Sequence, residues 1–166
     1  MKKILLALIS FVCVSISHAQ KTYIWCGTLI DGISNDAKKN MTIIVEKNKI
    51  IGVQNGFTAP GTSDKSIDLK SKTVTPGWID MHVHLEGETK KGNLADRFTL
   101  NPTDVAFESL KYANVTLMAG FTTVRDLGGS GVNISLRNAI NKGLIKGPRV
   151  FTSGRSIATT GGHADP

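Results

Sequence analysis

The sequence contains little cysteine, little proline and few aromatic residues. Its 166 residues include two cysteines, five prolines and only 6% Phe, Trp and Tyr. So few cysteines exclude a small domain held together by disulfides, and 17 glycines without a regular spacing exclude a collagen-like repeat. With 40% hydrophobic and 20% charged residues, the chain is not a disordered polar polymer either. The composition therefore predicts a globular protein.

The sequence also lacks an apolar run long enough for a transmembrane helix. Residues 4–16 are apolar or small, but a spanning helix needs about 20 residues. Lys2 and Lys3 precede this run and Ser17-His18-Ala19 follow it, a pattern typical of a secretory signal peptide. We therefore predict that residues 1–19 are a signal peptide. The mature protein is then periplasmic or secreted and keeps no stable membrane anchor.

Removal of this segment changes the cysteine and charge balance. Cleavage after Ala19 leaves 147 of the 166 residues, lowers the formal charge from +7 to +5 and removes Cys13. Cys26 then has no disulfide partner within the chain, and we predict that it is a small buried side chain on a strand. The other basic residues form scattered pairs rather than a stripe with interleaved aromatics, so no nucleic-acid partner is expected.

Residues 20–75 have the pattern of short strands. Two β-branched stretches, 41–46 and 49–53, flank Lys47-Asn48, which predicts a tight hairpin with Asn48 in the left-handed region. Further strands are expected at residues 23–26, 28–30, 67–69 and 73–75. About 55 residues of short strands cannot bury a large core by themselves.

Residues 76–166 alternate between strand and helix patterns. This order is typical of a parallel α/β sheet, either doubly wound or closed into a barrel. Thr103 and Asp104 are candidate N-terminal caps of the first helix, and Gly120 and Gly143 are placed to end the two helices. The expected elements are a strand at 78–85, a helix over 106–117, a strand at 121–125, a glycine-rich loop at 128–131, a short helix between 133 and 143, and a strand at 149–153.

The first of these strands carries the clearest chemical signal. Alternate side chains of a strand share a face, so Asp80, His82 and His84 are predicted on one face, opposite the apolar residues between them. Two imidazoles at this spacing can converge on one metal ion, and imidazole suits zinc, iron, nickel or copper. Asp80 is predicted to orient one of these histidines. Because a zinc site needs at least three protein ligands, an exposed pair of ordinary histidines is the alternative.

Four motifs follow one another along the chain. They lie at 27–32 (GTLIDG), 76–84 (PGWIDMHVH), 120–129 (GFTTVRDLGG), and 147–150 (GPRV) with 160–163 (TGGH). In this order they resemble the amidohydrolase superfamily of metal-dependent hydrolases, in particular its imidazolonepropionase-like and Xaa-Pro-dipeptidase-like branch. The resemblance implies an α/β fold, a (β/α)₈ TIM-like barrel preceded by part of a small β-sandwich. It also implies that 20–75 belong to the sandwich and that 76–166 begin the barrel, with about three of its eight strands.

The same resemblance assigns roles to individual residues. It implies that His82 and His84 bind one or two divalent metal ions, zinc being the favoured ion, and that His163 contacts substrate. The family's bridging lysine, two further histidines and catalytic aspartate come from later strands. A barrel of this type needs roughly 250 residues, whereas residues 77–166 supply 90. The chain is therefore expected to be an N-terminal fragment that is inactive alone.

The expected activity of the intact protein is hydrolysis of an amide or cyclic amide C–N bond, with Xaa-Pro peptides among the candidate substrates. Deamination and deacetylation are alternatives within the superfamily, and a non-catalytic exported metal-binding or interaction module is the alternative outside it. Arg125 and Asp126 end the second barrel strand, where an approach to the barrel mouth, an ion pair and a helix cap all remain open. The glycine-rich loop lacks the Lys-Ser or Lys-Thr pair of a P-loop, which favours a simple turn.

Overall fold

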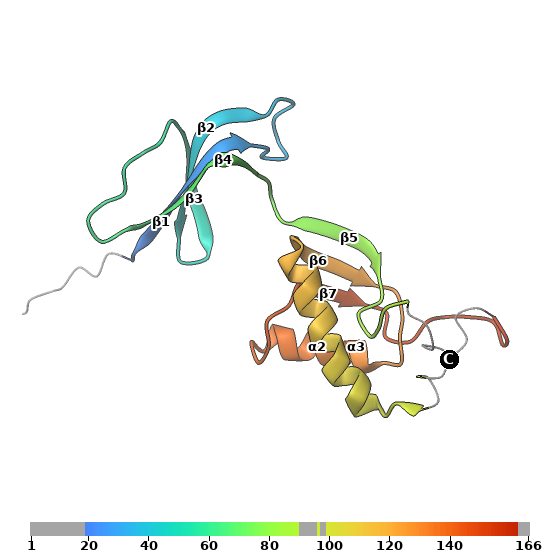
Figure 1. Cartoon of the computed structure of the whole chain (residues 1–166). Coiled ribbons are helices and arrows are strands. Elements are labelled where there is room, and N and C mark those ends of the chain that lie inside the picture. Colours follow the sequence, from blue (N-terminus) through green and yellow to red (C-terminus); the bar gives the residue numbers. More distant parts are fainter. Residues whose placement is uncertain (1–18, 90–95, 97–98, 163–166) are drawn as a thin grey trace, which may run out of the picture. The chain divides into compact units, whose positions relative to one another are not determined.

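The computed structural model describes residues 19–89, 96 and 99–162. The chain divides into two compact units that meet between Thr75 and Pro76, and each is described by itself (Figure 1). The predicted signal peptide lies almost entirely outside the described residues. Within the described part of the chain, no helix is both long enough and apolar enough to cross a membrane.

The first unit contains one sheet. Within residues 19–75 its strand order is β3-β2-β1-β4. The pairs β1–β2 and β2–β3 are antiparallel, whereas β4 runs parallel to β1. The strands are β1 (Lys21–Leu29), β2 (Lys38–Glu46), β3 (Lys49–Asn55) and β4 (Lys65–Val74).

The predicted hairpin is confirmed, but its turn differs in detail. Glu46 pairs with Lys49, so Lys47 and Asn48 form a two-residue turn. Lys47, not Asn48, has the positive φ, at 55°. A positive φ at the first central position alone is the pattern of a type II′ turn, which suits the twist of a hairpin as well as the expected turn would.

Two short strands were expected where the structure has the single strand β4. The β1–β4 register shifts between Cys26 and Thr28, where two steps along β1 match four along β4, so the extra residues lie within β4. Gly27 lies at this shift, and a Cβ atom there would overlap the carbonyl of Lys70. The close approach of the two backbones therefore requires glycine at this position.

The core of the first unit lies along β1 and β2. Its buried side chains are Cys26, Leu29, Met41 and Ile43. The prediction for Cys26 is confirmed, and burial raises the pKa of its thiol. On β3, Ile50 and Ile51 remain exposed. Thr42 and Ile44 are also buried, so β2 is covered on both faces while large apolar side chains of β3 remain in contact with solvent.

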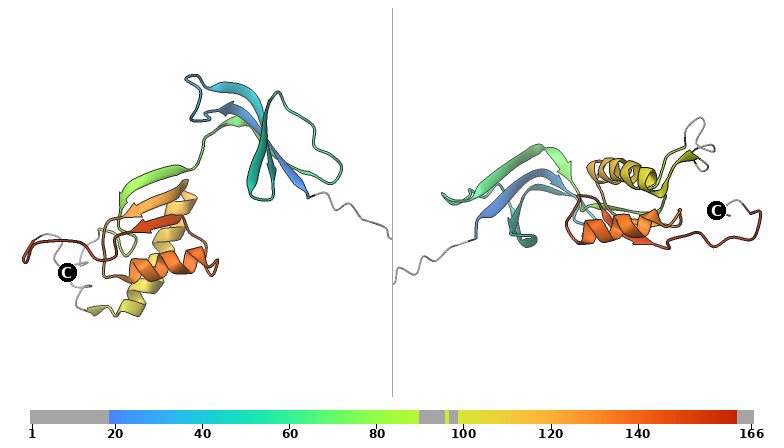
Figure 2. Two further views of the ribbon diagram at one scale, coloured as in Figure 1. Left: turned by 180° about the vertical axis from the view of Figure 1, so that it is seen from behind. Right: turned by 90° about the horizontal axis from the view of Figure 1, so that it is seen from below.

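The second unit is a parallel α/β arrangement, which confirms the predicted class. Within the described part of residues 76–166, the sheet order is β5-β6-β7 and both pairs are parallel. The helix α2 contacts β6, α3 contacts β7, and the helices contact each other, so they cover one face of the sheet (Figures 1 and 2). The elements are β5 (Trp78–Val83), α2 (Pro102–Met118), β6 (Phe121–Asp126), α3 (Val132–Asn141) and β7 (Arg149–Thr152).

The helix ends follow the sequence signals closely, with one correction. Asn101, not Thr103 or Asp104, is the N-cap of α2. Asp104 lies three residues later, and its carboxylate accepts a hydrogen bond of 2.9 Å from the backbone N–H of Asn101, as in a capping box. Gly120 and Gly143 follow the two helices with φ of 98° and 70°, so both predicted stops are confirmed.

The core of the second unit lies between the sheet and the helices. Val124 and Val150 come from β6 and β7, Leu85 follows β5, and Ala113 and Leu136 come from α2 and α3. Large apolar side chains on the two outer strands stay exposed, among them Ile79, Met81 and Phe151. The packed face is therefore the helix face of the sheet.

Candidate metal centre

The carboxyl ends of β5, β6 and β7 meet at one edge of the parallel sheet, and the candidate site lies there. Backbone hydrogen bonds join the segments that leave the strands. The N–H of Leu127 donates to the carbonyl of Val83 at 3.3 Å, and the N–H of Ser153 donates to the carbonyl of Asp126 at 3.1 Å. These bonds fix the three strand ends relative to one another.

The two predicted metal ligands lie side by side at this edge. His82 is on β5, His84 follows the strand directly, and their ring centroids are 5.3 Å apart with the rings inclined at 70°. Nδ1 of His84 lies 2.7 Å from the carbonyl oxygen of Gly128. A carbonyl can only accept, so Nδ1 carries the proton and Nε2 of a neutral His84 keeps its lone pair.

Asp80 lies on the same strand, but the predicted alternation is interrupted. Asp80 pairs with Val124 and Val83 pairs with Asp126, so three steps along β5 match two along β6. Such a bulge ends the simple rule that every second side chain shares a face. The Asp80 carboxylate accepts a hydrogen bond of 2.9 Å from the backbone N–H of His82. Its interaction with the histidine pair in the described chain is therefore through the backbone.

Asp126, the last residue of β6, is fully buried. Its carboxylate accepts hydrogen bonds from the backbone N–H of Leu85 at 2.9 Å and from that of Gly128 at 3.2 Å. Its neighbour Arg125 is exposed and donates through Nε to the carbonyl of Met81 at 2.8 Å. Of the options that the sequence left open for Asp126, the structure shows neither an ion pair nor a helix cap in the described region.

Asn133, in the first turn of α3, supports Asp126. Its Nδ2 donates to Asp126 at 3.0 Å and to the carbonyl of Gly154 at 3.0 Å. The side chain is fully buried, and its Oδ1 has no hydrogen-bond partner among the described residues. Asn133 thus links the ends of β6 and β7 through a polar contact inside the unit.

Glu86, two residues after His84, occupies the N-terminus of α3. Its carboxylate accepts hydrogen bonds from the backbone N–H of Ser130 at 2.6 Å and of Asn133 at 2.8 Å. A negative charge is favourable at this end of the helix dipole. A Cβ atom at Gly129 would overlap the Glu86 carboxylate. The glycine-rich loop therefore binds the carboxylate of Glu86, which agrees with the simple turn predicted there.

The described residues supply part of a metal site. They contain no cluster of three or more His, Cys, Asp or Glu side chains arranged around one point. The two imidazoles nevertheless fit such a role, because the Nδ1–H of His84 donates a hydrogen bond to the carbonyl of Gly128, as the second ring nitrogen of a metal-binding histidine usually does. His163, predicted to contact substrate, lies outside the described residues.

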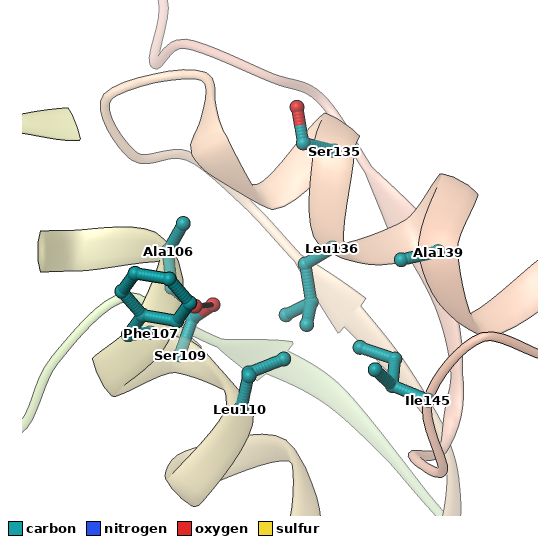
Figure 3. Close-up of a pocket in the computed structure, with 8 residues that line it drawn as sticks. All are labelled: Ala106, Phe107, Ser109, Leu110, Ser135, Leu136, Ala139 and Ile145. Carbon is teal, nitrogen blue, oxygen red and sulfur yellow. Dashed lines mark hydrogen bonds between the residues drawn. The ribbon is translucent and has the colours of Figure 1, made fainter. Parts of the chain in front are cut away.

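A cavity of about 200 Å³ lies between α2 and α3 (Figure 3). Leu110, Leu136 and Ile145 point toward one another across it. Its lining is otherwise small or apolar and includes no ionisable side chain. The cavity therefore belongs to the helix packing and offers no group for catalysis.

The sequence pattern points to the histidine pair but not to the three polar side chains that bond the segments after β5 and β6. These side chains are Asp126, Asn133 and Glu86. A usable signal was present for Asp126: it stands at the carboxyl end of a parallel strand and directly before a glycine-rich loop, where functional groups of such folds gather.

The amidohydrolase family model matches residues 73–166, which include the whole of the candidate site. Ochratoxinase of Aspergillus niger is 28% identical over 157 residues, which cover 93% of this chain and 32% of that enzyme. Imidazolonepropionase of Fusobacterium nucleatum is 31% identical over 126 residues, covering 58% of this chain and 30% of that enzyme. The resemblance read from the four motifs is thereby confirmed.

A crystal structure of a Xaa-Pro dipeptidase with methionine bound in its active site superimposes on the chain with a TM-score of 0.82 at 44% identity. The match covers 89% of this chain and 36% of the dipeptidase. The chain thus spans about a third of the length of ochratoxinase and of the dipeptidase.

Proposed function

The chain belongs to the amidohydrolase family, and we propose that the full-length protein hydrolyses a carbon–nitrogen bond of a small molecule or short peptide with the help of a divalent metal ion. The observation that carries the proposal is the histidine pair at the carboxyl edge of a parallel sheet. Its rings are 5.3 Å apart, and Nδ1 of His84 is held by a carbonyl.

The proposed architecture is a (β/α)₈ barrel that begins with β5, β6 and β7, accompanied by a small β-sandwich that includes β1–β4. Exposed Ile79 and Phe151 on the outer strands are sites where further strands would pack. Ile50 and Ile51 on β3 are corresponding sites for the sandwich. Active sites of such barrels lie at the carboxyl ends of the strands, which is where the histidine pair lies.

In the proposed mechanism, His82 and His84 hold the metal through ring nitrogens, and the other ligands come from outside the described residues. A bound zinc ion would supply a Lewis acid that polarises the scissile carbonyl and lowers the pKa of water. The carbonyl of Gly128 keeps the proton of His84 on Nδ1, and Asp80 holds the backbone of His82. His163 is proposed to contact the substrate.

The proposed substrates are amides of the kind found in Xaa-Pro dipeptides. Support comes from the Xaa-Pro dipeptidase structure, which combines 44% identity with 89% coverage of this chain. We further propose that residues 1–19 direct export, which N-terminal sequencing of the mature protein tests.

The test uses the full-length protein. Purified enzyme is offered Xaa-Pro dipeptides, N-acyl amino acids and, as probes of deamination, adenosine-type amines. We expect hydrolysis of an amide that is lost after treatment with a chelator and restored by zinc. Release of ammonia from the amines alone would move the assignment to a deaminase, and an activity that survives the chelator would contradict the metal-dependent mechanism.

A further inference from the structure

Hydrogen bonds connect Asp126 to the backbone next to His84 and to the residue that accepts from its imidazole. The proposed role of His84 as a metal ligand does not by itself explain this network. We propose that Asp126 is a positioning residue that fixes the imidazole of His84 with its proton on Nδ1. The inference deepens the proposed function, since it concerns the geometry of one of the proposed metal ligands.

One carboxylate holds the backbone on both sides of the imidazole contact. Asp126 accepts the N–H of Leu85, the residue directly after His84, at 2.9 Å. It also accepts, at 3.2 Å, the N–H of Gly128, whose own carbonyl lies 2.7 Å from Nδ1 of His84. The same side chain therefore sets the position of the histidine and of its hydrogen-bond acceptor.

The conformation of the acceptor segment explains why such support is needed. Gly128 has a φ of 148°, and a Cβ atom there would overlap the side chain of Ser156. A glycine has more accessible backbone conformations than any other residue, so its carbonyl keeps one direction only if neighbouring contacts hold it. The hydrogen bond from its N–H to Asp126 is such a contact.

Asp126 is fully buried, and its carboxylate acts through hydrogen bonds rather than through packing alone. A fully buried carboxylate is unfavourable unless hydrogen bonds satisfy it. Asp126 accepts two backbone N–H groups and the Nδ2 of Asn133. An apolar side chain of similar size would leave the N–H groups of Leu85 and Gly128 unpaired, and bonds to an ionised acceptor are shorter and stronger than neutral ones.

The consequence for His84 concerns its tautomer. A proton on Nδ1 that is donated to Gly128 leaves Nε2 free to bind a metal. Removal of a group that orients a metal-binding histidine costs about 10–100-fold in metal affinity. Asp126 acts one step further from the ring, through the backbone of Leu85 and Gly128, and we expect its loss to fall within that range.

The test compares Asp126→Asn with Asp104→Asn in the full-length protein. Asp104 is the matched control because it is an exposed carboxylate that also accepts a backbone N–H, at the start of α2. The first readout is the tautomer of His84 in metal-free protein, measured by NMR of ¹⁵N-labelled histidine and assigned by its absence in His84→Ala. The second is zinc affinity measured by competition with a chromogenic chelator.

We expect Nδ1–H in the wild type and in Asp104→Asn. In Asp126→Asn we expect a mixture of tautomers and a loss of zinc affinity of about 10–100-fold. A wild-type His84 protonated on Nε2 overturns the inference, and so does a folded Asp126→Asn protein with unchanged tautomer and zinc affinity. If Asp126→Asn does not fold, Asp126→Ser, which also removes the carboxylate, replaces it, and an unchanged tautomer and zinc affinity there overturn the inference as well.

The tautomer readout needs neither metal nor activity. If the full-length protein proves to bind no metal, the proposed function fails while the role of Asp126 in orienting His84 is still decided. If the protein binds zinc but the tautomer does not depend on Asp126, only the present inference fails.

Discussion

The two units of the chain use buried polar side chains for different purposes. In the first unit, the fully buried hydroxyl of Thr42 donates to the carbonyl of Gly56 at 2.7 Å and accepts the N–H of Thr58 at 3.0 Å. It ties the segment after β3 to β2. In the second unit, the buried Asp126 and Asn133 lie at the strand ends and hold the segments around His84.

The difference shows which buried polar groups point to function. Thr42 is neutral, its two partners satisfy it, and it lies on β2, whose two neighbours in the sheet are antiparallel, so the fold alone accounts for it. Asp126 is an acidic side chain, and Asn133 keeps one oxygen without a partner in the described chain. Buried groups of this kind are costly to the fold, and they lie next to the candidate metal ligands.

The largest loss of stability should come from a substitution in the hydrophobic core of the second unit, which is distinct from the polar groups at its strand ends. Leu136→Ala removes a buried side chain of α3, and we expect a loss of about 2–5 kcal/mol in the free energy of unfolding. Leu144→Ala is the control, because Leu144 is 73% exposed. Chemical denaturation of the full-length protein measures both, and equal losses for the two variants would contradict the described core.

A smaller effect should follow from the buried hydroxyl of the first unit. Thr42→Val leaves the carbonyl of Gly56 and the N–H of Thr58 without their partner, at a cost of about 1–3 kcal/mol. Zinc affinity should stay unchanged, in contrast to Asp126→Asn. A Thr42→Val protein that loses as much zinc affinity as Asp126→Asn would contradict the different roles given to the buried polar side chains of the two units.

The smallest effect is expected at the surface of the first unit. The Lys38 ammonium, 2.7 Å from Asp31, and the backbone N–H groups of Ser34 and Ile33 hold the pKa of the Asp31 carboxyl well below its usual range. A carboxyl whose pKa is lowered by folding stabilises the protein above its unfolded pKa of about 3.9, and this contribution is lost as the pH falls below that value.

Asp31→Asn should therefore lower the melting temperature slightly at pH 6, and the difference from wild type should shrink as the pH is lowered below about 4. Thermal melts at several pH values measure it. A difference that grows toward acid pH would have the wrong sign for this ion pair.

Local signals in the sequence were sufficient for much of the fold. Lys47-Asn48 predicted the hairpin, Gly120 and Gly143 predicted the helix ends, and the spacing of His82 and His84 predicted that the two rings would lie together. Each of these features depends on residues close to one another in the chain.

The features that the sequence did not reveal depend on contacts between distant residues. Asp126 and Leu85 are 41 positions apart, and His84 and Gly128 are 44 apart. The bulge between Asp80 and Val83 exists only relative to the register of β6. No periodicity within one strand reports such pairings, so the support of His84 became visible only in the folded chain.

Metal content tests most directly whether the strand ends of the second unit carry a metal site. Full-length wild type and the double variant His82→Ala/His84→Ala are purified in parallel with Leu144→Ala as the folded control, and bound zinc is measured by elemental analysis. We expect zinc in the wild type and the control and its loss from the double variant. A folded double variant with the zinc content of the wild type would show that His82 and His84 do not bind the metal.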